Sequence, residues 1–404
     1  MRALIAVACF LLAGPLPAQD DETLEIHYIN IGQGGGTLII GPNGTTVMYD
    51  FGNVGRGRKI AEYLDDELDI SPSRGIDYAI VSHRDADHYG GYVGLIDAGY
   101  DINIANFDSG SDKRETEAMR RVWLTPAART SAGQIIRIPP GLTISLGNGA
   151  LLHVIAANGR VFGHDSDAVP LPSARNENDR SISLYLKYRN FDYVLDGDLG
   201  AGEEECTARQ THQKDFQLPA AKQLAARGMD PELGVDVLHI SHHGSESSTS
   251  AAYYNDLKPE VGLISVGLNQ RSFRHPRVDV VERVLLGSDR APCVTAPPLK
   301  ALFQTDWGRA GTTASGSTSF AGMPVGDIRL VTDGKEEFQI SGSGLVEDPD
   351  LGACVPIGGD AWSFAIDDTP GSDQPSFSQA SVNETCMDQP SLCGCTIFFQ
   401  ENSN

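Results

Sequence analysis

The feature that most constrains this chain is a short apolar run that leads directly into a cluster of metal-binding residue types. The run 76–82 reads IDYAIVS, which is typical of a strand buried on both faces. His83, Asp85, Asp87 and His88 follow it within six residues. Imidazole together with carboxylate favours Zn²⁺, Fe or Mn²⁺ as the bound ion. The alternative is a polar loop with these residues by chance, but such density is improbable with ten histidines in 404 residues.

Two further loops hold candidate ligands that could complete a binuclear site. Asp198 follows an apolar strand, so its carboxylate could bridge two ions. His242 and His243 follow the apolar run 235–240. The alternatives are a plain turn at Asp198 and packed or solvated imidazoles at the two histidines. We favour metal ligands, because one loop alone does not easily close a site for two ions.

Strands and helices are mixed along the chain, which predicts an α/β fold. Apolar strands end repeatedly in polar loops rich in His and Asp, so we expect an α/β sandwich with its site on one rim. A Gly-, Ser- and Thr-rich stretch at 308–322 predicts an inserted loop. The main predicted strands are 24–31, 37–40, 45–50, 76–82, 135–138, 151–156, 181–188, 193–195, 235–240, 261–266, 327–332 and 336–340, and the main helices are 58–68, 219–227 and 278–285.

These segments together resemble the metallo-β-lactamase superfamily, in the branch of the metal-hydrolase domain of the competence protein ComEC/Rec2. The matching segments are INIGQGGGTLIIGPNG–VMYDFG, VSHRDADHYGG, ENDRSISLYLKY–FDYVLDGDL, DVLHISHHGSESST, VGLNQRSFRHP–VERVL and FQTDWG. They occur in the family's order over about residues 24–308, and the hairpin 327–341 would be the last piece. The resemblance implies a metallo-β-lactamase-type αββα sandwich, here with a cysteine-containing C-terminal extension.

The resemblance also implies a ligand set for two divalent metal ions, which we expect to be zinc, with manganese or iron as alternatives. The first ion would be bound by His83 and Asp85, the second by Asp87 and His88, and both by a bridging Asp198, with His242 as the last ligand. Asp50 would support the ligand loop from below.

Further residues are expected to act on the substrate rather than hold the ions. We place Asp87, His243 and His275 in the catalytic group, and Arg84 and Arg274 in substrate binding. The sequence departs from the family pattern at Asn30 and Gly35, where the family has acids, and no clear middle histidine ligand follows His88; the interval contains His164, Asp165 and Asp167.

The N-terminus reads as a secretory signal over 1–18, with Arg2 before a short apolar run and Ala18 at the cleavage point. The predicted metallo-β-lactamase-like hydrolase domain covers 22–342. Residues 343–404 would form a polar tail that is held by disulfides. Removal of the signal leaves six cysteines, which favours disulfides in an exported chain but allows 15 connectivities. A thiolate metal site at 393–395 is the alternative. We expect a secreted or periplasmic protein without a membrane span.

Charge limits the classes of partner. Lys plus Arg is 31 and Asp plus Glu is 54, so the formal charge is 31 − 54 = −23. Stable coating of nucleic acid needs a basic surface and is therefore not expected. A phosphate in a metal site stays compatible, because bound cations dominate the local field. We expect an exported hydrolase that cleaves phosphodiesters or phosphoesters through a metal-activated water. The alternatives are a lactone, lactam or other ester hydrolase, and a non-catalytic cell-surface binding module.

Overall fold

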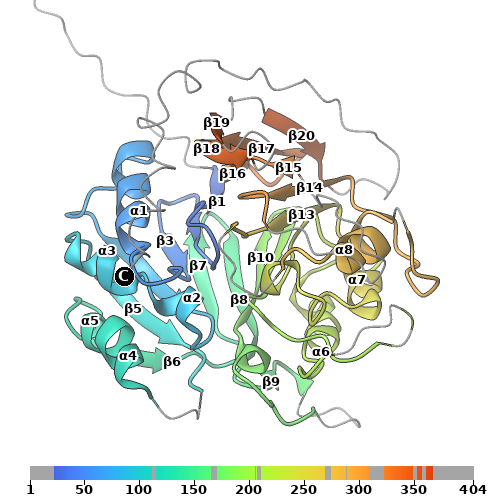
Figure 1. Ribbon diagram of the computed structural model, residues 1–404, viewed down its shortest axis with the longest axis horizontal. Coiled ribbons are helices and arrows are strands. Elements are labelled where there is room, and N and C mark those ends of the chain that lie inside the picture. Colours follow the sequence, from blue (N-terminus) through green and yellow to red (C-terminus); the bar gives the residue numbers. More distant parts are fainter. Residues whose placement is uncertain are drawn as a thin grey trace, which may run out of the picture.

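Two mixed β-sheets face each other, and helices cover their outer faces (Figure 1). The computed structural model describes residues 22–111, 115–164, 171–204, 206, 211–268, 274–287, 289–308, 323–348, 353–356 and 361–366. The predicted signal, Asp165, Asp167, most of the predicted inserted loop and the chain after 366 lie outside these residues.

The first sheet contains the N-terminal half of the chain and the C-terminal hairpin. Its order is β20 (Ala361–Ala365), β17 (Glu337–Ser343), β16 (Asp327–Thr332), β1 (Leu24–Tyr28), β2 (Thr37–Ile40), β3 (Thr46–Tyr49), β4 (Ile76–Val81), β5 (Ile102–Asp108) and β6 (Ile135–Arg137). The strands from β3 to β6 pair in parallel, and the others pair antiparallel.

In the second sheet, the strands that come first in the chain pair antiparallel, and the later ones pair in parallel. Its order is β15 (Met323–Pro324), β14 (Ala301–Gln304), β13 (Val261–Ile264), β12 (Val237–His239), β11 (Phe191–Leu195), β10 (Ser183–Tyr188), β8 (Ala150–Ala157) and β7 (Thr143–Gly147), with β9 (Arg160–Val161) on β8. A separate pair is formed by β18 (Leu345–Asp348) and β19 (Ala353–Pro356). The parallel pairing of β11 with β12 brings their carboxyl ends to one edge.

The strand residues alternate between two cores, as the period of a β-strand requires. Val237 packs between the sheets, whereas the next residue, Leu238, packs under the outer helices. The helices are α1 (Gly57–Glu62), α2 (Ala86–Tyr89), α3 (Tyr92–Asp97), α4 (Glu117–Met119) and α5 (Thr125–Ala127) beside the first sheet, and α6 (Gln217–Ala221), α7 (Ala251–Leu257) and α8 (Val278–Val280) beside the second. The layers therefore run helix, sheet, sheet, helix, which confirms the predicted αββα sandwich.

Part of the segment predicted as a tail joins the first sheet. Strand β20 pairs antiparallel with β17 and buries Trp362 and Phe364 in the core between the sheets. The intervening Ser363 is exposed, so this strand shows the alternation of an edge strand with one buried face. The division of the chain into domains stays a prediction.

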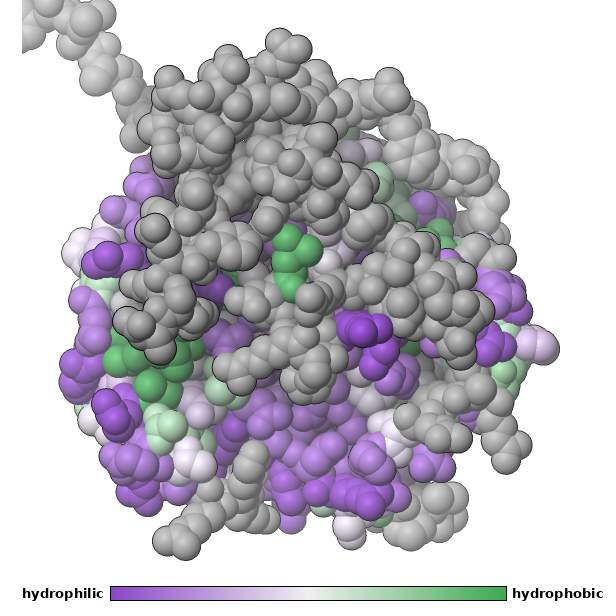
Figure 2. All heavy atoms as spheres, in the orientation of Figure 1, coloured by the Kyte–Doolittle hydropathy of each residue, from purple (hydrophilic) through white to green (hydrophobic). Residues whose placement is uncertain are grey.

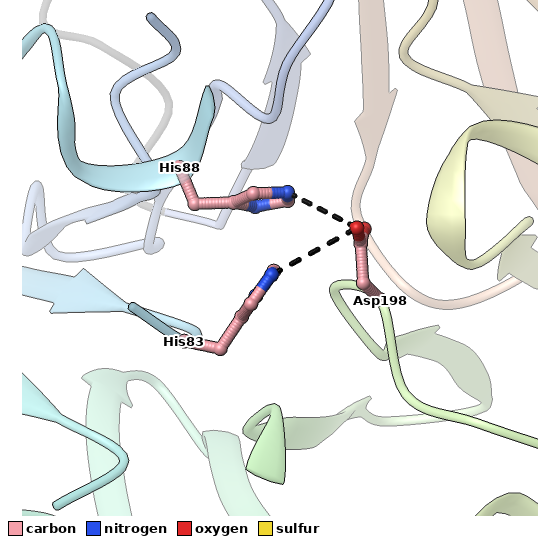
Figure 3. Close-up of side chains that lie close together, drawn as sticks. All are labelled: His83, His88 and Asp198. Carbon is pink, nitrogen blue, oxygen red and sulfur yellow. Dashed lines mark ion pairs between the residues drawn. The ribbon is translucent and has the colours of Figure 1, made fainter. Parts of the chain in front are cut away.

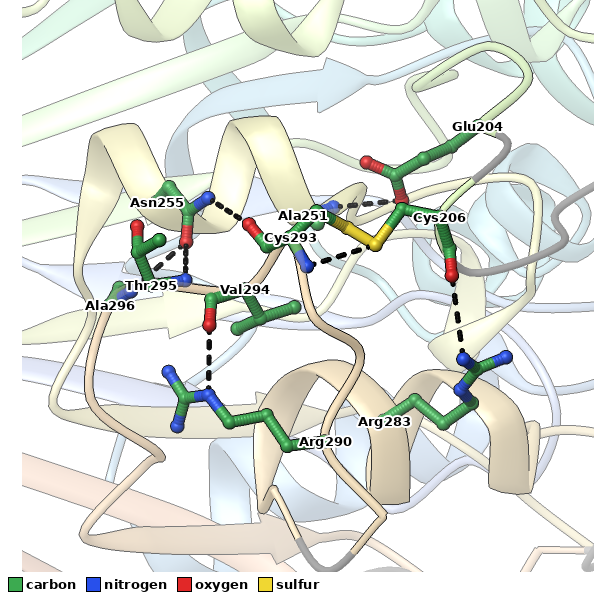
Figure 4. The surroundings of a disulfide bond; sticks show 10 residues. All are labelled: Glu204, Cys206, Ala251, Asn255, Arg283, Arg290, Cys293, Val294, Thr295 and Ala296. Carbon is green, nitrogen blue, oxygen red and sulfur yellow. Dashed lines mark hydrogen bonds between the residues drawn. A yellow bond between two sulfur atoms is a disulfide. The ribbon is translucent and has the colours of Figure 1, made fainter.

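One disulfide lies within the sandwich (Figure 4). It joins Cys206, before α6, to Cys293, after α8, across 87 residues. Asn255 of α7 donates a 2.8 Å hydrogen bond to the carbonyl of Cys293, and Arg283 donates to the carbonyl of Cys206. The bond therefore secures two loops to the helical layer. The tail cysteines Cys386, Cys393 and Cys395 lie outside the described residues.

Much of the visible surface is hydrophilic (Figure 2). Figure 2 shows hydrophilic residues gathered over the lower part of the visible face. The large hydrophobic side chains that are exposed among the described residues are Val54, Ile104, Ile136 and Leu286. In the described part of the chain, no helix is long and apolar enough to cross a membrane.

Candidate metal centre

Three loops, each after a buried strand, bring the candidate ligands together. His83 follows β4 of the first sheet, and α2 then carries Asp87 and His88. Asp198 follows β11, and His243 follows β12, the neighbouring parallel strand of the second sheet. The site lies where the ends of the two sheets meet, as the sequence predicted.

Asp198 is the meeting point of these side chains (Figure 3). Its Oδ2 lies 3.3 Å from Nε2 of His88 and 3.8 Å from Nε2 of His83. Its Oδ1 lies 3.8 Å from Nε2 of His243. Nε2 of His243 also lies 3.6 Å from Oδ2 of Asp87. A carboxylate with both oxygens directed at imidazole nitrogens can bridge two cations.

Two overlapping groups could each hold a metal ion. One contains His83, His88 and Asp198, and the other contains Asp87, His88 and His243; within each group the ligand atoms lie within 4.8 Å of one another. Histidine nitrogens with carboxylate oxygens are a donor set for Zn²⁺, Mn²⁺ or Fe.

Hydrogen bonds fix the tautomers of His83 and His88. The Asp50 carboxylate lies 2.7 Å from Nδ1 of His88 and can only accept, so the hydrogen of that imidazole is on Nδ1. Ser82 donates its hydroxyl hydrogen to Asp50 and can therefore only accept from Nδ1 of His83, 3.0 Å away. In the neutral form that binds a cation, both rings therefore carry the lone pair on Nε2, the nitrogen that faces Asp198. Asp50 supports the ligand loop, as the resemblance implied.

His243 is oriented in the same way from the other sheet. Its Nδ1 donates a 2.7 Å hydrogen bond to the carbonyl of Ser265, which leaves the lone pair on Nε2. In the described part of the chain, the buried Nε2 atoms of His83, His88 and His243 have no hydrogen-bond partner. Three such nitrogens beside two carboxylates fit a divalent cation, because buried polar atoms otherwise find partners.

The electrostatics of the centre show strong coupling between acids and imidazoles. Burial alone would raise the pKa of the Asp198 carboxyl, but the imidazoles of His88, His242 and His243 outweigh it and hold that pKa well below its usual range. Burial alone would lower the pKa of His88, but Asp198, Asp50 and Asp87 outweigh it and raise that pKa. The carboxylates are therefore ionised and available to a cation at neutral pH.

Three residues at the site have an unusual backbone conformation. Asp50, His242 and His243 have φ values of 63°, 52° and 54°, in the left-handed region that non-glycine residues seldom adopt. Such strain is typical of functional sites, where surrounding structure holds a side chain in a required direction.

The predicted ligands Asp85 and His242 lie at the edge of the centre. Among the described residues, neither belongs to the two groups above. Oδ2 of Asp85 lies 3.6 Å from Nε2 of His83, and 41% of its side chain is exposed. Nε2 of His242 lies 3.6 Å from Oδ2 of Asp198. The resemblance implied His242 as the last ligand, but the second group contains His243 instead.

The predicted substrate-side residues lie in different surroundings. The His275 ring is buried with its centroid 5.5 Å from that of His242, and burial lowers its pKa to about 2. Nε and Nη2 of Arg84 both donate to Oδ2 of Asp108, at the end of β5. Arg274 is exposed. The roles of these three residues stay predictions.

Sequence reasoning missed residues that position the ligands. Ser82 precedes His83 directly, so its place in the motif was a usable signal. Ser265, Asn178 and Gln213 contact the site histidines from distant loops, and no local pattern announces them.

Gly35 is also explained by the structure. A Cβ at this position would lie 2.9 Å from Oδ2 of Asp50 and 3.2 Å from Nδ1 of His88. A side chain at position 35 would therefore press on the pair of Asp50 and His88.

Comparisons with known proteins agree with this picture. No family model matches the chain. It is 26% identical over 267 residues to Recombination protein 2 of Haemophilus influenzae, which covers 65% of this chain and 26% of that protein. It is 28% identical over 112 residues to ComE operon protein 3 of Bacillus subtilis, which covers 28% of this chain and 12% of that protein. The chain thus spans about a quarter or less of the length of these relatives.

Several solved structures are weakly similar to this chain. They include a metal-dependent hydrolase of the β-lactamase superfamily, with 16% identity, 60% of this chain and 87% of that chain covered, and a TM-score of 0.33. They also include a metallo-β-lactamase from Pontibacter korlensis. It is 15% identical, the match covers 48% of this chain and 74% of that chain, and the TM-score is 0.29.

The αββα topology and the two ligand groups define the class as a metallo-β-lactamase-type fold with a candidate divalent-metal site. Within this class, the chain is distantly similar to the ComEC/Rec2 proteins.

Proposed function

We propose that this chain hydrolyses phosphodiester or phosphoester bonds. The observation that carries the proposal is the convergence of three imidazole lone pairs, those of His83, His88 and His243, on Asp198. The name of the first relative, Recombination protein 2, refers to a process on DNA and supports a phosphodiester as the substrate class. The charge of −23 disfavours long-range attraction of a polyanion, so a small phosphodiester is the better fit.

The ligands would hold divalent ions, and our proposal is two of them. When bound, such ions supply Lewis-acid chemistry: they polarise the substrate oxygen under attack and lower the pKa of water. Asp198 is the residue placed to bridge them, and His83, His88 and His243 would supply neutral nitrogens.

Asp87 is the residue best placed to orient the attacking water. Burial alone would raise the pKa of this carboxyl, but the nearby His88 and His243 outweigh it and lower that pKa, so the group is ionised and accepts hydrogen bonds. Its side chain is 31% exposed, whereas that of Asp198 is only 6% exposed, so Asp87 faces the substrate side. An oriented water loses less entropy on reaction.

One observation favours an uncharged ester as the second candidate. Several arginines that could bind phosphate are engaged within the chain: Arg84 with Asp108, Arg180 with Asn158 and Arg277 with Glu246. A lactone, lactam or other ester would not need them. A non-catalytic binding module is less favoured, because the ligand set is intact.

A substrate panel under identical metal loading tests the proposal. The zinc- or manganese-loaded chain is assayed with bis(p-nitrophenyl) phosphate, p-nitrophenyl acetate, a lactone and a β-lactam. We expect chelator-sensitive turnover of the phosphodiester, with turnover lost in His88→Ala. Preferential cleavage of a carboxylic ester would move the function to the second candidate, and turnover that survives complete metal removal would rule out both.

We also propose export to an oxidising compartment, outside the cell or in a periplasm. The disulfide between Cys206 and Cys293 supports this, because structural disulfides persist where thiols are not kept reduced. Intact mass of the chain recovered from its native cell envelope or medium tests it. Cleavage after Ala18 is expected, and an uncut cytosolic chain with free thiols would contradict it.

A further inference from the structure

We propose that His242 is a substrate-binding residue rather than a metal ligand, and that His242, Asn178, Gln213 and Ser247 form a subsite for an oxygen of the substrate. We call these four residues the His242 subsite. The inference rests on the proposed function, because the oxygen would belong to the phosphoryl group held at the metal centre.

The ring nitrogens of His242 differ from those of the ligand histidines. Ser247 Oγ lies 2.7 Å from Nδ1 of His242, and Nε2 of Gln213 lies 3.2 Å from the same nitrogen. Nδ2 of Asn178 lies 3.3 Å from Nε2 of His242. The Nε2 atoms of the ligand histidines, by contrast, make no hydrogen bond in the described part of the chain. Both nitrogens of His242 thus already have polar neighbours from this chain.

The tautomer of His242 makes it a donor toward the centre. Nδ1 faces the hydroxyl of Ser247 and the amide nitrogen of Gln213, both of which can donate. We therefore assign the lone pair to Nδ1, which also lies 3.5 Å from the donor Nδ2 of Asn178, and the hydrogen to Nε2, which faces the acceptor Oδ2 of Asp198 at 3.6 Å. An Nε2–H group cannot bind a cation, but it can donate to a phosphoryl oxygen.

The position of His242 suits a substrate contact. Its side chain is 19% exposed, whereas that of His243 is 4% exposed. Its Nε2 lies 3.6 Å from Oδ2 of Asp198, so an oxygen held beside the metal centre would be within reach. The Asn178 amide, at the same nitrogen, supplies a second hydrogen-bonding group at this point.

The subsite is built from three segments that the chain ties together. The buried Asp179 accepts hydrogen bonds from the backbone N–H of Arg175, at 2.7 Å, and from that of Lys214, at 2.9 Å. These bonds connect the segment of Asn178 to the segment of Gln213. The backbone N–H of Ala201 donates to the carbonyl of Ser247, and Ala201 forms a β-bridge with Asp215 beside Gln213, which connects the third segment. The groups are therefore positioned before a substrate arrives.

Metal content and phosphate affinity, measured in parallel, test the inference. The probes are Zn²⁺ alone, with metal per chain measured by elemental analysis after dialysis, and inorganic phosphate, with its affinity for the zinc-loaded chain measured by calorimetry. The variants are His242→Ala, His242→Gln and His243→Ala. The matched control is His153→Gln, a buried histidine of β8 outside the site.

We expect His242→Ala to keep the zinc content of the wild type and to lose about 10- to 100-fold in phosphate affinity, the value of one hydrogen bond to a charged group. His242→Gln keeps a donor and should restore part of that affinity, and His243→Ala should lose zinc. Loss of zinc from His242→Ala would overturn the inference, as would unchanged phosphate affinity or absent phosphate binding in the wild type. Phosphodiester turnover with normal phosphate binding in His242→Ala would leave the proposed function standing and defeat only this inference. Phosphate binding that depends on His242, without turnover of the phosphodiester, would support this inference and defeat the proposed function.

Discussion

The carboxylate of Asp50 accepts a 2.7 Å hydrogen bond from Nδ1 of His88 and thereby directs the other nitrogen of that ring at Asp198. The same carboxylate accepts the hydroxyl of Ser82, which in turn orients His83. One residue below the ligand loop therefore fixes the direction of two ligands.

Replacement of this carboxylate should weaken metal binding. We expect Asp50→Asn to lower zinc affinity about 10- to 100-fold, because residues that orient metal ligands typically contribute that much. Competitive titration with a chromogenic chelator measures the affinity. Asp77→Asn is the control, since Asp77 hydrogen-bonds Thr46 at the opposite end of β4. An unchanged affinity in Asp50→Asn would contradict this role.

A methyl group at position 35 should disturb the hydrogen-bonded pair of Asp50 and His88. Gly35→Ala would place a Cβ 2.9 Å from Oδ2 of Asp50, closer than such contacts occur, so the carboxylate must move away from His88. We predict weaker zinc binding with the chain still folded, measured by the same titration together with circular dichroism. Zinc affinity equal to that of the wild type would show that the pair tolerates displacement.

The disulfide should contribute to stability without forming part of the site. Replacement of Cys206 and Cys293 together by Ala releases a constraint across 87 residues, which typically costs about 2–5 kcal/mol of unfolding free energy. Urea unfolding of the zinc-free chain measures the change. A matched comparison is the wild type after mild reduction, which should move the midpoint in the same direction. An unfolding free energy equal to that of the oxidised wild type would contradict the prediction.

A buried acid away from the centre should give the stability of the chain a defined pH dependence. Burial alone would raise the pKa of Glu25, but hydrogen bonds with His27 and Arg329 outweigh it and lower the pKa to about 2. Because the folded-state pKa is depressed, this contribution is fully present above the ordinary value of 4.5 and is lost as pH falls toward about 2.

We therefore expect Glu25→Gln to be less stable than the wild type at pH 7, with the difference shrinking as pH falls from 4.5 to 3. Urea unfolding at a series of pH values measures it. Glu337→Gln, at an exposed position of β17, is the control and should change little. A difference that stays constant with pH would contradict the assignment.

The sequence predicted the ligand loop and the fold because both depend on local patterns. A buried strand that runs into His83, Asp87 and His88 is readable without a structure, and the alternation of strands and helices indicates the sandwich. Asp198 was identified as a partner because it ends another apolar strand, and Figure 3 shows it opposite His83 and His88.

The choice between His242 and His243 could not be predicted in this way. Both residues lie in the loop after β12, and their left-handed backbone decides which ring points at Asp87. The disulfide was equally hidden, because six cysteines allow 15 pairings. The alternation in β20, with Trp362 and Phe364 buried, was a readable signal that the polar composition of the surrounding segment obscured.

Metal content of the purified chain tests the central claim most directly. After loading with Zn²⁺ and dialysis, elemental analysis of the wild type and of Asp198→Ala compares the bound metal per chain. The account predicts tightly bound zinc in the wild type and its loss in Asp198→Ala, because this carboxylate belongs to the first ligand group and its Oδ1 lies 3.8 Å from Nε2 of His243 in the second. A wild-type chain that retains no divalent metal, or an Asp198→Ala chain that retains as much as the wild type, would contradict it.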